Sequence, residues 1–283
     1  MSEHPHTTIP KIDPMKGEIT FLGTGTSTGI PEIGCKCATC TSKDYRDKRL
    51  RASILLSFWE REGADAYRYV IDCGPDFREQ MIRENISSLE GIFLTHEHYD
   101  HVGGLDDIRP LFRGQADCPL YTEEYLSTIL KERMPYAFRA VAYPGVPHYS
   151  FTIIEPNTPF LLPKPKGIEI LPLRVIHGRL PILGFKIGNA AYLTDVKVVP
   201  EETIEALQGI EHLIIDGLRF YTHPTHFSVQ EAIDFGNSIG AKQIYLTHLA
   251  HTIGKHTEAE TILKSLDNRT HLAYDGMSFE ISV

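Results

Sequence analysis

Residues 95–101, which read THEHYDH, constrain this chain more than any other segment. They place three imidazoles and the carboxylate of Asp100 within six residues. His96 and His98 share one face of an extended segment because they are two residues apart. The apolar run 91–94 predicts a buried strand before the cluster, and Gly103-Gly104 frees the backbone after it. A solvated polar turn would explain so many donors poorly. The segment therefore predicts a strand-end loop that binds Zn, Mn or Fe.

Length and charge narrow the class of protein. A chain of 283 residues buries a generous core without a disulfide scaffold. The net charge of −9 argues against broad binding to nucleic acid or to an anionic membrane, although a metal centre can still attract a small anionic substrate. We see no secretory signal and no apolar run of membrane-spanning length. Five cysteines, three of them crowded into residues 35–40, favour a reduced, cytoplasmic protein with a metal site.

The hydrophobic pattern predicts a lead-in over residues 1–17 and one domain over 18–283. Strands are predicted at 18–22, 52–58, 67–71, 89–94, 168–176, 182–187, 190–194, 212–216 and 243–247. Helices are predicted at 75–85, 104–112, 122–133, 199–208, 227–239 and 257–266. Residues 134–165, rich in Pro and Tyr, suggest an insertion near the site. Early strands followed by strand–helix alternation indicate an α/β protein with sheets inside and helices outside.

Three further metal-binding side chains stand at predicted strand ends. His177 follows the strand at 168–176, Asp195 follows the one at 190–194, and His248 follows the one at 243–247. Sheets of α/β proteins build their sites at strand ends. Each residue alone is more simply a hydrogen-bonded surface group, but together with the histidine loop they complete a two-metal set.

This ordered set of residues resembles the metallo-β-lactamase fold superfamily over residues 18–282. The resemblance implies a four-layer αββα sandwich with a dinuclear site at one edge. It also implies the ligands: His96, His98 and His177 for one metal, Asp100, His101 and His248 for the other, and Asp195 bridging both. Because the superfamily contains hydrolases, nucleases, oxidoreductases and non-catalytic members, the resemblance specifies the fold better than the reaction.

A second metal pattern lies near the N-terminus. Three cysteines form Cys-x-Cys-x-x-Cys, which suits one tetrahedral Zn: Cys35, Cys37 and Cys40. Residues 21–40 resemble the phosphoribosyl 1,2-cyclic phosphate phosphodiesterase family of the carbon–phosphorus lyase pathway. That family takes its fourth structural ligand from a histidine just after the last catalytic one, which implies His251, with His256 as the competitor. Cys73 and Cys118 lie outside the pattern and are expected to be buried thiols.

The resemblance also suggests residues for proton transfer. In phosphodiesterase-type relatives a histidine at the start of a helix reaches the site, and His226 matches it; it would protonate the leaving oxygen or bind phosphate. Asp216 would orient His226, as an acidic residue does in the related tRNA 3′-end endonucleases. For His223, a surface or capping role is the simpler interpretation. Asp72 would fix the tautomer of a ligand. Asp275 is a weaker candidate, since an Asp-Gly turn explains it equally well.

We therefore predict a metal-dependent phosphodiesterase with two divalent ions, Zn or Mn, and one structural Zn. A metal-held hydroxide would attack a small cyclic or diester phosphate, such as a phosphoribosyl cyclic phosphate, with Asp100, His226 and Asp216 as catalytic residues. A homodimer is expected from the relatives.

Three alternatives stay open. The first is a tRNA 3′-end endonuclease, which the acidic charge and the lack of a basic arm disfavour. The second is a protein like the pyrroloquinoline-quinone biosynthesis B family, whose dinuclear ligand set is incomplete, unlike the one in this chain. The third is a non-catalytic metal-binding protein.

Overall fold

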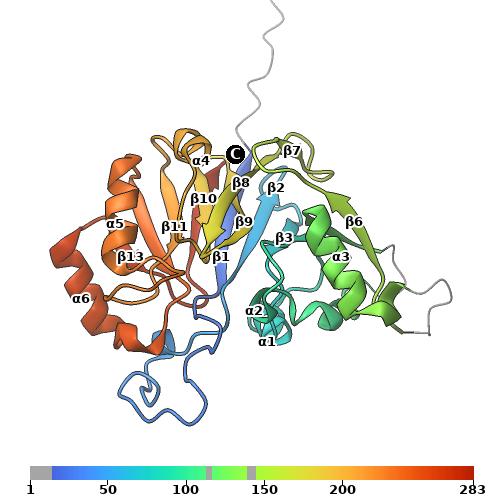
Figure 1. Cartoon of the computed structure of the whole chain (residues 1–283). Coiled ribbons are helices and arrows are strands. Elements are labelled where there is room, and N and C mark those ends of the chain that lie inside the picture. Colours follow the sequence, from blue (N-terminus) through green and yellow to red (C-terminus); the bar gives the residue numbers. More distant parts are fainter. Residues whose placement is uncertain (1–14, 113–116, 139–144) are drawn as a thin grey trace, which may run out of the picture.

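The computed structural model describes residues 15–112, 117–138 and 145–283. Two seven-stranded sheets form its centre (Figure 1). In spatial order the first sheet contains β14 (Ser278–Ser282), β1 (Lys16–Gly23), β2 (Ser53–Trp59), β3 (Tyr67–Ile71), β4 (Gly91–Phe93), β5 (Cys118–Thr122) and β6 (Tyr149–Ile153). The second contains β13 (Thr270–Leu272), β12 (Gln243–Thr247), β11 (His212–Asp216), β10 (Ala190–Leu193), β9 (Leu180–Ile187), β8 (Glu169–His177) and β7 (Phe160–Leu161).

The main hydrophobic core lies between the two sheets. Alternate side chains of each strand point inward, as the two-residue period of a strand requires, so Ile19 and Phe21 of β1 enter the same core as Phe185 of β9. The ring of Phe93 in β4 stacks on Tyr121 at a centroid distance of 4.5 Å and meets Phe185 edge-on at 5.4 Å. The first contact joins neighbouring strands of one sheet, and the second joins the two sheets across the core.

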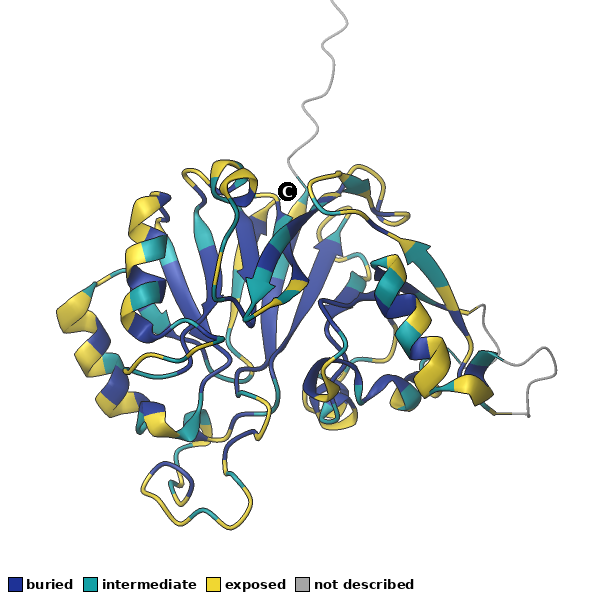
Figure 2. Cartoon of the chain, in the orientation of Figure 1, coloured by how far each residue is buried: buried dark blue, intermediate teal, exposed yellow. Residues whose placement is uncertain are grey.

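Helices cover the outer face of each sheet. The first sheet packs against α1 (Phe77–Arg83), α2 (Tyr99–Val102) and α3 (Glu124–Arg133), and the second against α4 (Glu201–Ala206), α5 (Val229–Ser238) and α6 (His256–Leu266). Figure 2 shows the strands mostly buried, with the exposed residues on the outward sides of the helices. The predicted four-layer αββα sandwich is therefore confirmed.

One predicted helix is wrong. The pattern predicts a helix over 104–112, but the structure has a short 3-10 helix, η2 (Leu105–Ile108), followed by turns. Pro110 offers no backbone N–H to continue a helix. Conversely, α2 and the strands β5, β13 and β14 appear where no helix or strand is predicted.

The predicted lead-in and the insertion fall partly outside the described residues. Strand β1 begins at Lys16, inside the predicted lead-in, and residues 1–14 of that lead-in are not described. The insertion at 134–165 contributes the edge strands β6 and β7, and residues 139–144 within it are not described. Nowhere in the described ranges is a helix long and apolar enough to cross a membrane. The division into a lead-in and one domain stays a prediction.

Candidate dinuclear metal centre

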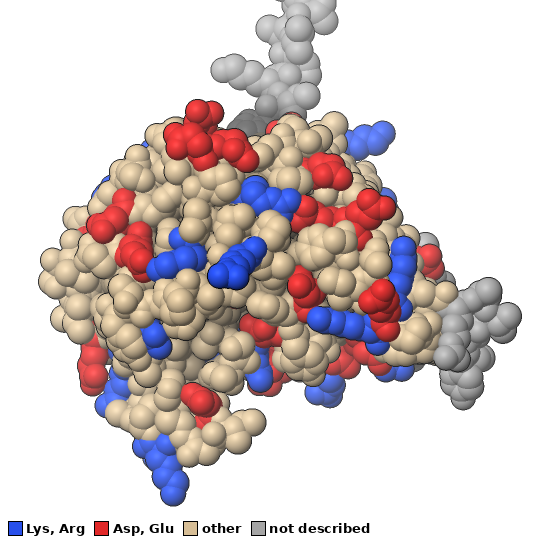
Figure 3. Space-filling model, viewed as in Figure 1, with Lys and Arg blue, Asp and Glu red and all other residues tan. Residues whose placement is uncertain are grey.

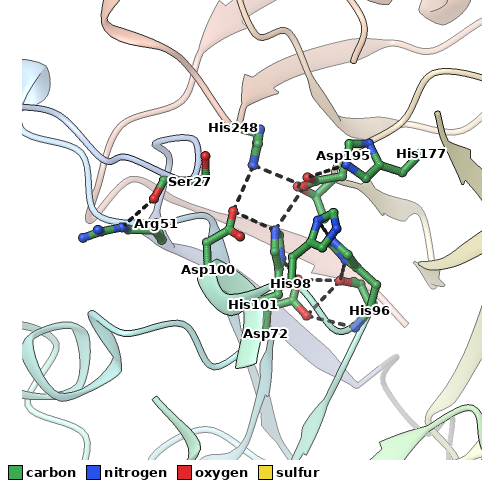
Figure 4. A network of polar contacts seen from close by, with 12 residues as sticks. Ser27, Arg51, Asp72, His96, His98, Asp100, His101, His177, Asp195 and His248 are labelled. Atoms are coloured by element: carbon green, nitrogen blue, oxygen red, sulfur yellow. Dashed lines mark hydrogen bonds and ion pairs between the residues drawn. The ribbon is translucent and has the colours of Figure 1, made fainter. Parts of the chain in front are cut away.

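Three site residues stand one or two positions after strands and share an unusual backbone conformation. Asp72 follows β3, Asp195 follows β10 and His248 follows β12, with φ of 67°, 56° and 55°. Residues other than glycine rarely adopt this left-handed conformation, which clusters at functional sites. Figure 4 shows the side chains of Asp195 and His248 converging on the same region as those of the histidine loop.

The histidine loop contains a helical turn that brings the later donors back toward the earlier ones. His98 is the N-cap of α2, and the backbone N–H of His101 donates to the His98 carbonyl at 3.0 Å. The first turn of α2 therefore carries Asp100 and His101. A Cβ at Gly74 would lie 2.1 Å from the Asp100 carbonyl oxygen, so only glycine lets α2 approach β3 this closely.

All seven predicted ligands gather in two clusters that share Asp195. Within each cluster the candidate ligand atoms lie within 4.8 Å of one another; the clusters are His96, His98, His177 and Asp195, and Asp100, His101, Asp195 and His248. His101 Nε2 lies 3.2 Å from both Asp100 Oδ2 and Asp195 Oδ1, and His248 Nε2 lies 3.3 Å from Asp195 Oδ1. Two adjacent four-donor sets with one common carboxylate are what a pair of bridged metal ions requires.

The polar groups of this centre are buried without sufficient protein partners. His101 Nε2 and both ring nitrogens of His248 lack a hydrogen-bond partner among the described residues. Burial works to raise the pKa of Asp195, but His248 and His101 outweigh it and hold that pKa well below its usual range. Buried nitrogens facing an ionised carboxylate cost free energy unless a cation binds them, so the donor set fits divalent metals.

Neighbouring groups fix which nitrogen each histidine presents. Asp72 Oδ2 accepts from His101 Nδ1 at 2.7 Å, and the Thr225 carbonyl accepts from His177 Nδ1 at 2.9 Å. Asp72 also accepts from the backbone N–H and hydroxyl of Thr95, whose oxygen lies 2.9 Å from His96 Nδ1. These contacts leave Nε2 of His96, His101 and His177 for the centre, whereas His98 turns its Nδ1 toward His96 Nε2 at 3.0 Å.

His226 and Asp216 lie together beside the two clusters. His226 Nδ1 is 2.8 Å from Asp216 Oδ2, and its ring is 4.6 Å from that of His177 and 4.9 Å from that of His248. Burial and the neighbouring His248 lower the pKa of His226 to about 4, while burial raises the pKa of Asp216. The pair forms a buried imidazole–carboxylate couple at the edge of the centre.

The three N-terminal cysteines surround His251. Their sulfurs, of Cys35, Cys37 and Cys40, lie 3.3, 3.4 and 3.5 Å from His251 Nδ1. A tetrahedral Zn with ordinary bond lengths separates sulfur and nitrogen ligands by about 3.5 Å. The structure thus brings His251 to the cysteines, whereas His256 Nδ1 contacts the guanidinium of Arg49 at 3.2 Å. Figure 1 shows the N-terminal loop (blue) that carries the cysteines reaching toward the segment before α6.

Other candidates lie away from these sites. Cys73 and Cys118 are buried under the helices of the first sheet. Asp275 accepts from the Thr24 hydroxyl and the Leu50 backbone N–H, both at 2.7 Å, and so joins two loops. The sequence reasoning did not assign roles to Thr95 and Thr225, which orient the metal-facing histidines. Thr95 begins the histidine motif and could have been noticed there, but nothing in the sequence singles out the carbonyl of Thr225.

Comparisons with known proteins place this geometry in a family. Residues 67–249 match the model of the beta-lactamase superfamily domain. A new diphosphatase from the PhnP family, known from its crystal structure, is 36% identical in sequence to this chain. The two structures match with a TM-score of 0.84 over 95% of this chain and 98% of that one. Zn-bound PqqB from Methylobacterium extorquens has a similar fold, with a TM-score of 0.73 at 18% identity over 93% of this chain and 99% of its own.

Two relatives known by sequence carry different names. An octanoyltransferase of Porphyromonas gingivalis is 43% identical over 91% of this chain, but the match spans only half of the length of that protein. Ribonuclease Z of Listeria innocua is 24% identical over 93% of this chain and 99% of its own.

Proposed function

The chain belongs to the beta-lactamase superfamily and, within it, to the PhnP-like family, and from this premise we propose that it is a dinuclear phosphodiesterase for a small cyclic or diester phosphate. Its relatives confirm the predicted metal-dependent hydrolase. The observation that carries the finer proposal is the pair of donor clusters sharing Asp195, with the His226–Asp216 couple beside them.

The proposal assigns the donors to two metal ions. His96, His98 and His177 would hold one ion, Asp100, His101 and His248 the other, and Asp195 both. When bound, the two ions would lower the pKa of a water molecule and offset the charge that develops on a phosphoryl oxygen. Zn and Mn both accept this set of nitrogen and oxygen donors.

The chain's own residues supply the proton that a leaving alkoxide needs. Asp216 accepts the Nδ1 proton of His226, so the opposite nitrogen, Nε2, is the one left for substrate. Asp216 also accepts from the Phe227 backbone N–H at 3.3 Å, which fixes the carboxylate in place. In its imidazolium form His226 would carry a second proton on Nε2 and donate it to the leaving oxygen as the general acid, while Asp216 would position the ring and offset its charge.

Two other activities receive less support. A ribonuclease Z-like activity would need a surface that attracts a long polyanion, but Figure 3 shows basic and acidic side chains intermixed on the displayed face, and the net charge is −9. An octanoyl transfer through a thioester on the enzyme would need an accessible thiol, but Cys73 and Cys118 are fully buried and the other three cysteines surround His251.

We further propose that Cys35, Cys37, Cys40 and His251 hold one structural Zn, which would tie the N-terminal loop to the segment after β12. None of the five cysteines, all within the described residues, forms a disulfide, which fits a reducing compartment such as the cytoplasm. A homodimer remains part of the proposal.

The test is hydrolysis of bis(p-nitrophenyl) phosphate by purified protein loaded with Mn or Zn, beside Asp100→Ala. We expect metal-dependent turnover that falls at least about a hundredfold in the variant, because Asp100 would hold one metal. Asp234→Ala, which removes an exposed carboxylate from α5, is the matched control. No turnover by folded, metal-loaded protein would reject the phosphodiesterase proposal and direct attention to thioester or lactone substrates.

A further inference from the structure

Lys197 joins three segments that the proposed chemistry uses, although that chemistry assigns it no role. It lies two residues after Asp195, the carboxylate shared by the two donor clusters. Its backbone N–H donates to the carbonyl of Ile176, the residue before His177, at 2.8 Å. Its side chain crosses to the segment before α5, where Nζ donates to the carbonyl of His226 at 3.3 Å. One residue therefore connects the ends of β8 and β10 to the segment that carries His226.

The contact with His226 fixes its main chain rather than its ring. The carbonyl of His226 and the N–H of Phe227 belong to one peptide unit, and in a trans unit they point in opposite directions. Lys197 Nζ donates to that carbonyl, and the N–H donates to Asp216 Oδ1 at 3.3 Å. The peptide plane is thus held from both sides. Because Asp216 Oδ2 also accepts from His226 Nδ1 at 2.8 Å, the backbone and the ring of His226 are fixed together.

A carboxylate holds the ammonium group of Lys197 in this position. Glu231 Oε1 lies 2.7 Å from Lys197 Nζ, and Glu231 Oε2 accepts from the Ser228 backbone N–H at 2.7 Å as part of the capping box of α5. The Lys197 side chain is only 21% exposed. An ammonium group that is neutralised and mostly buried has little to offer a substrate anion. Its charge-assisted hydrogen bonds within the protein are therefore its main contribution.

We propose that Lys197 is a positioning residue for His226, one that keeps Nε2 of the imidazole at the place where the leaving oxygen would stand. This inference rests on the proposed phosphodiesterase function. A general acid needs hydrogen-bond contact with the atom that it protonates, and a displacement of about 1 Å can cost about a hundredfold in rate. His226 lies in a segment without regular secondary structure, so contacts such as this one must supply its rigidity.

The first test compares Lys197→Met with Lys197→Arg on two diesters, one with an alkoxide leaving group and one with p-nitrophenolate. Lys197→Met removes the donor but nearly keeps the length of the side chain. We expect its kcat for the alkoxide diester to fall about tenfold to a hundredfold at unchanged KM and metal content, with a much smaller loss for p-nitrophenolate. Lys197→Arg keeps a donor and should recover most of the loss. Lys242→Met, which removes an exposed lysine paired with Glu211, is the matched control and should behave like the wild type.

A double-mutant cycle tests whether Lys197 acts through His226. If it does, Lys197→Met should cost little further activity in a His226→Ala background, so the two losses should not add. Additive losses, or equal losses of Lys197→Met for both leaving groups, would overturn the positioning role while leaving the phosphodiesterase intact.

Amide hydrogen exchange tests the inference without turnover. The Phe227 N–H belongs to the peptide unit that Lys197 holds, so it should exchange about tenfold faster in Lys197→Met and at about the wild-type rate in Lys197→Arg. The N–H of Ile244 in β12, which donates to the Arg269 carbonyl at 2.9 Å, reports general destabilisation and should exchange equally in all three proteins. An unchanged rate for Phe227 in Lys197→Met would overturn the inference. Faster exchange in a protein whose wild type hydrolyses no diester would instead reject only the proposed function.

Discussion

The imidazole of His226 and the carboxylate of Asp216 meet at 2.8 Å between Nδ1 and Oδ2, at a position where the His226 ring also lies within 5 Å of two proposed metal ligands. The carboxylate ends β11, and the imidazole precedes Ser228, the N-cap of α5. The Ser228–Glu231 capping box fixes the start of that helix. Strand and helix together therefore hold the couple in one geometry.

Replacing His226 should reveal a general acid through the leaving group. We expect His226→Ala to lower kcat by about 10²–10⁴-fold for a diester with an alkoxide leaving group, because such a group needs the proton. The loss should be much smaller with p-nitrophenolate, which leaves without protonation. Asp216→Asn should show the same leaving-group dependence with a smaller loss. Equal losses for both leaving groups, at unchanged metal content, would contradict the assignment.

Removing the charge of Asp72 should weaken metal binding without removing a ligand. Asp72 is fully buried and accepts from His101 Nδ1 at 2.7 Å, so its charge makes that imidazole a stronger ligand. We expect Asp72→Asn to reduce the affinity for one of the two metals about 10- to 100-fold. Competition with a chelating dye measures this affinity. Asp44→Asn, which removes a surface ion pair with Arg46 but keeps a side-chain acceptor for the Arg46 backbone N–H, should have no effect.

Much of the fold follows from local patterns in the sequence. Runs such as 212–216 and 243–247 are apolar and bounded by polar residues, and both become strands with the predicted limits. Strand β14 was not predicted because its partner, β1, lies far away in the sequence: Ser282 pairs with Lys16. The short helix α2 is not predicted because its residues are suited to metal binding rather than to helix formation.

The resemblance to known families implied both the ligand set and His251, but no local pattern in the residues themselves separates His251 from His256. The two histidines are five residues apart, and both could reach the cysteines in an unfolded chain. In the structure His256 is engaged elsewhere, because its Nδ1 accepts from the fully buried guanidinium of Arg49. No local pattern reveals that contact, nor the left-handed backbone of Asp195 and His248.

Loss of one cysteine should remove one zinc ion and destabilise the protein. Cys37→Ser breaks the set around His251, and His251 lies three residues after the proposed ligand His248. We expect one Zn fewer per chain and a Tm lower by roughly 5 °C or more, since metal binding energy contributes to folding. Cys118→Ala, which replaces a buried cysteine outside the set, should leave the zinc content of the protein unchanged. Unchanged zinc content in Cys37→Ser would exclude this site.

Stability should fall on acidification partly through His256. Burial, with the charge of Arg49, lowers the pKa of His256 from 6.5 to about 4. Between these values the unfolded chain takes up a proton that the folded protein refuses, so the free energy of unfolding decreases as pH falls, by at most about 1.4 kcal/mol per pH unit. His256→Asn keeps an acceptor for Arg49 but does not titrate. Urea unfolding at pH 7 and pH 5 should therefore show a loss about 2 kcal/mol larger in the wild type than in the variant. If the free energy of unfolding falls by the same amount in both proteins, His256 is not the group that titrates, because their remaining ionisable groups are identical.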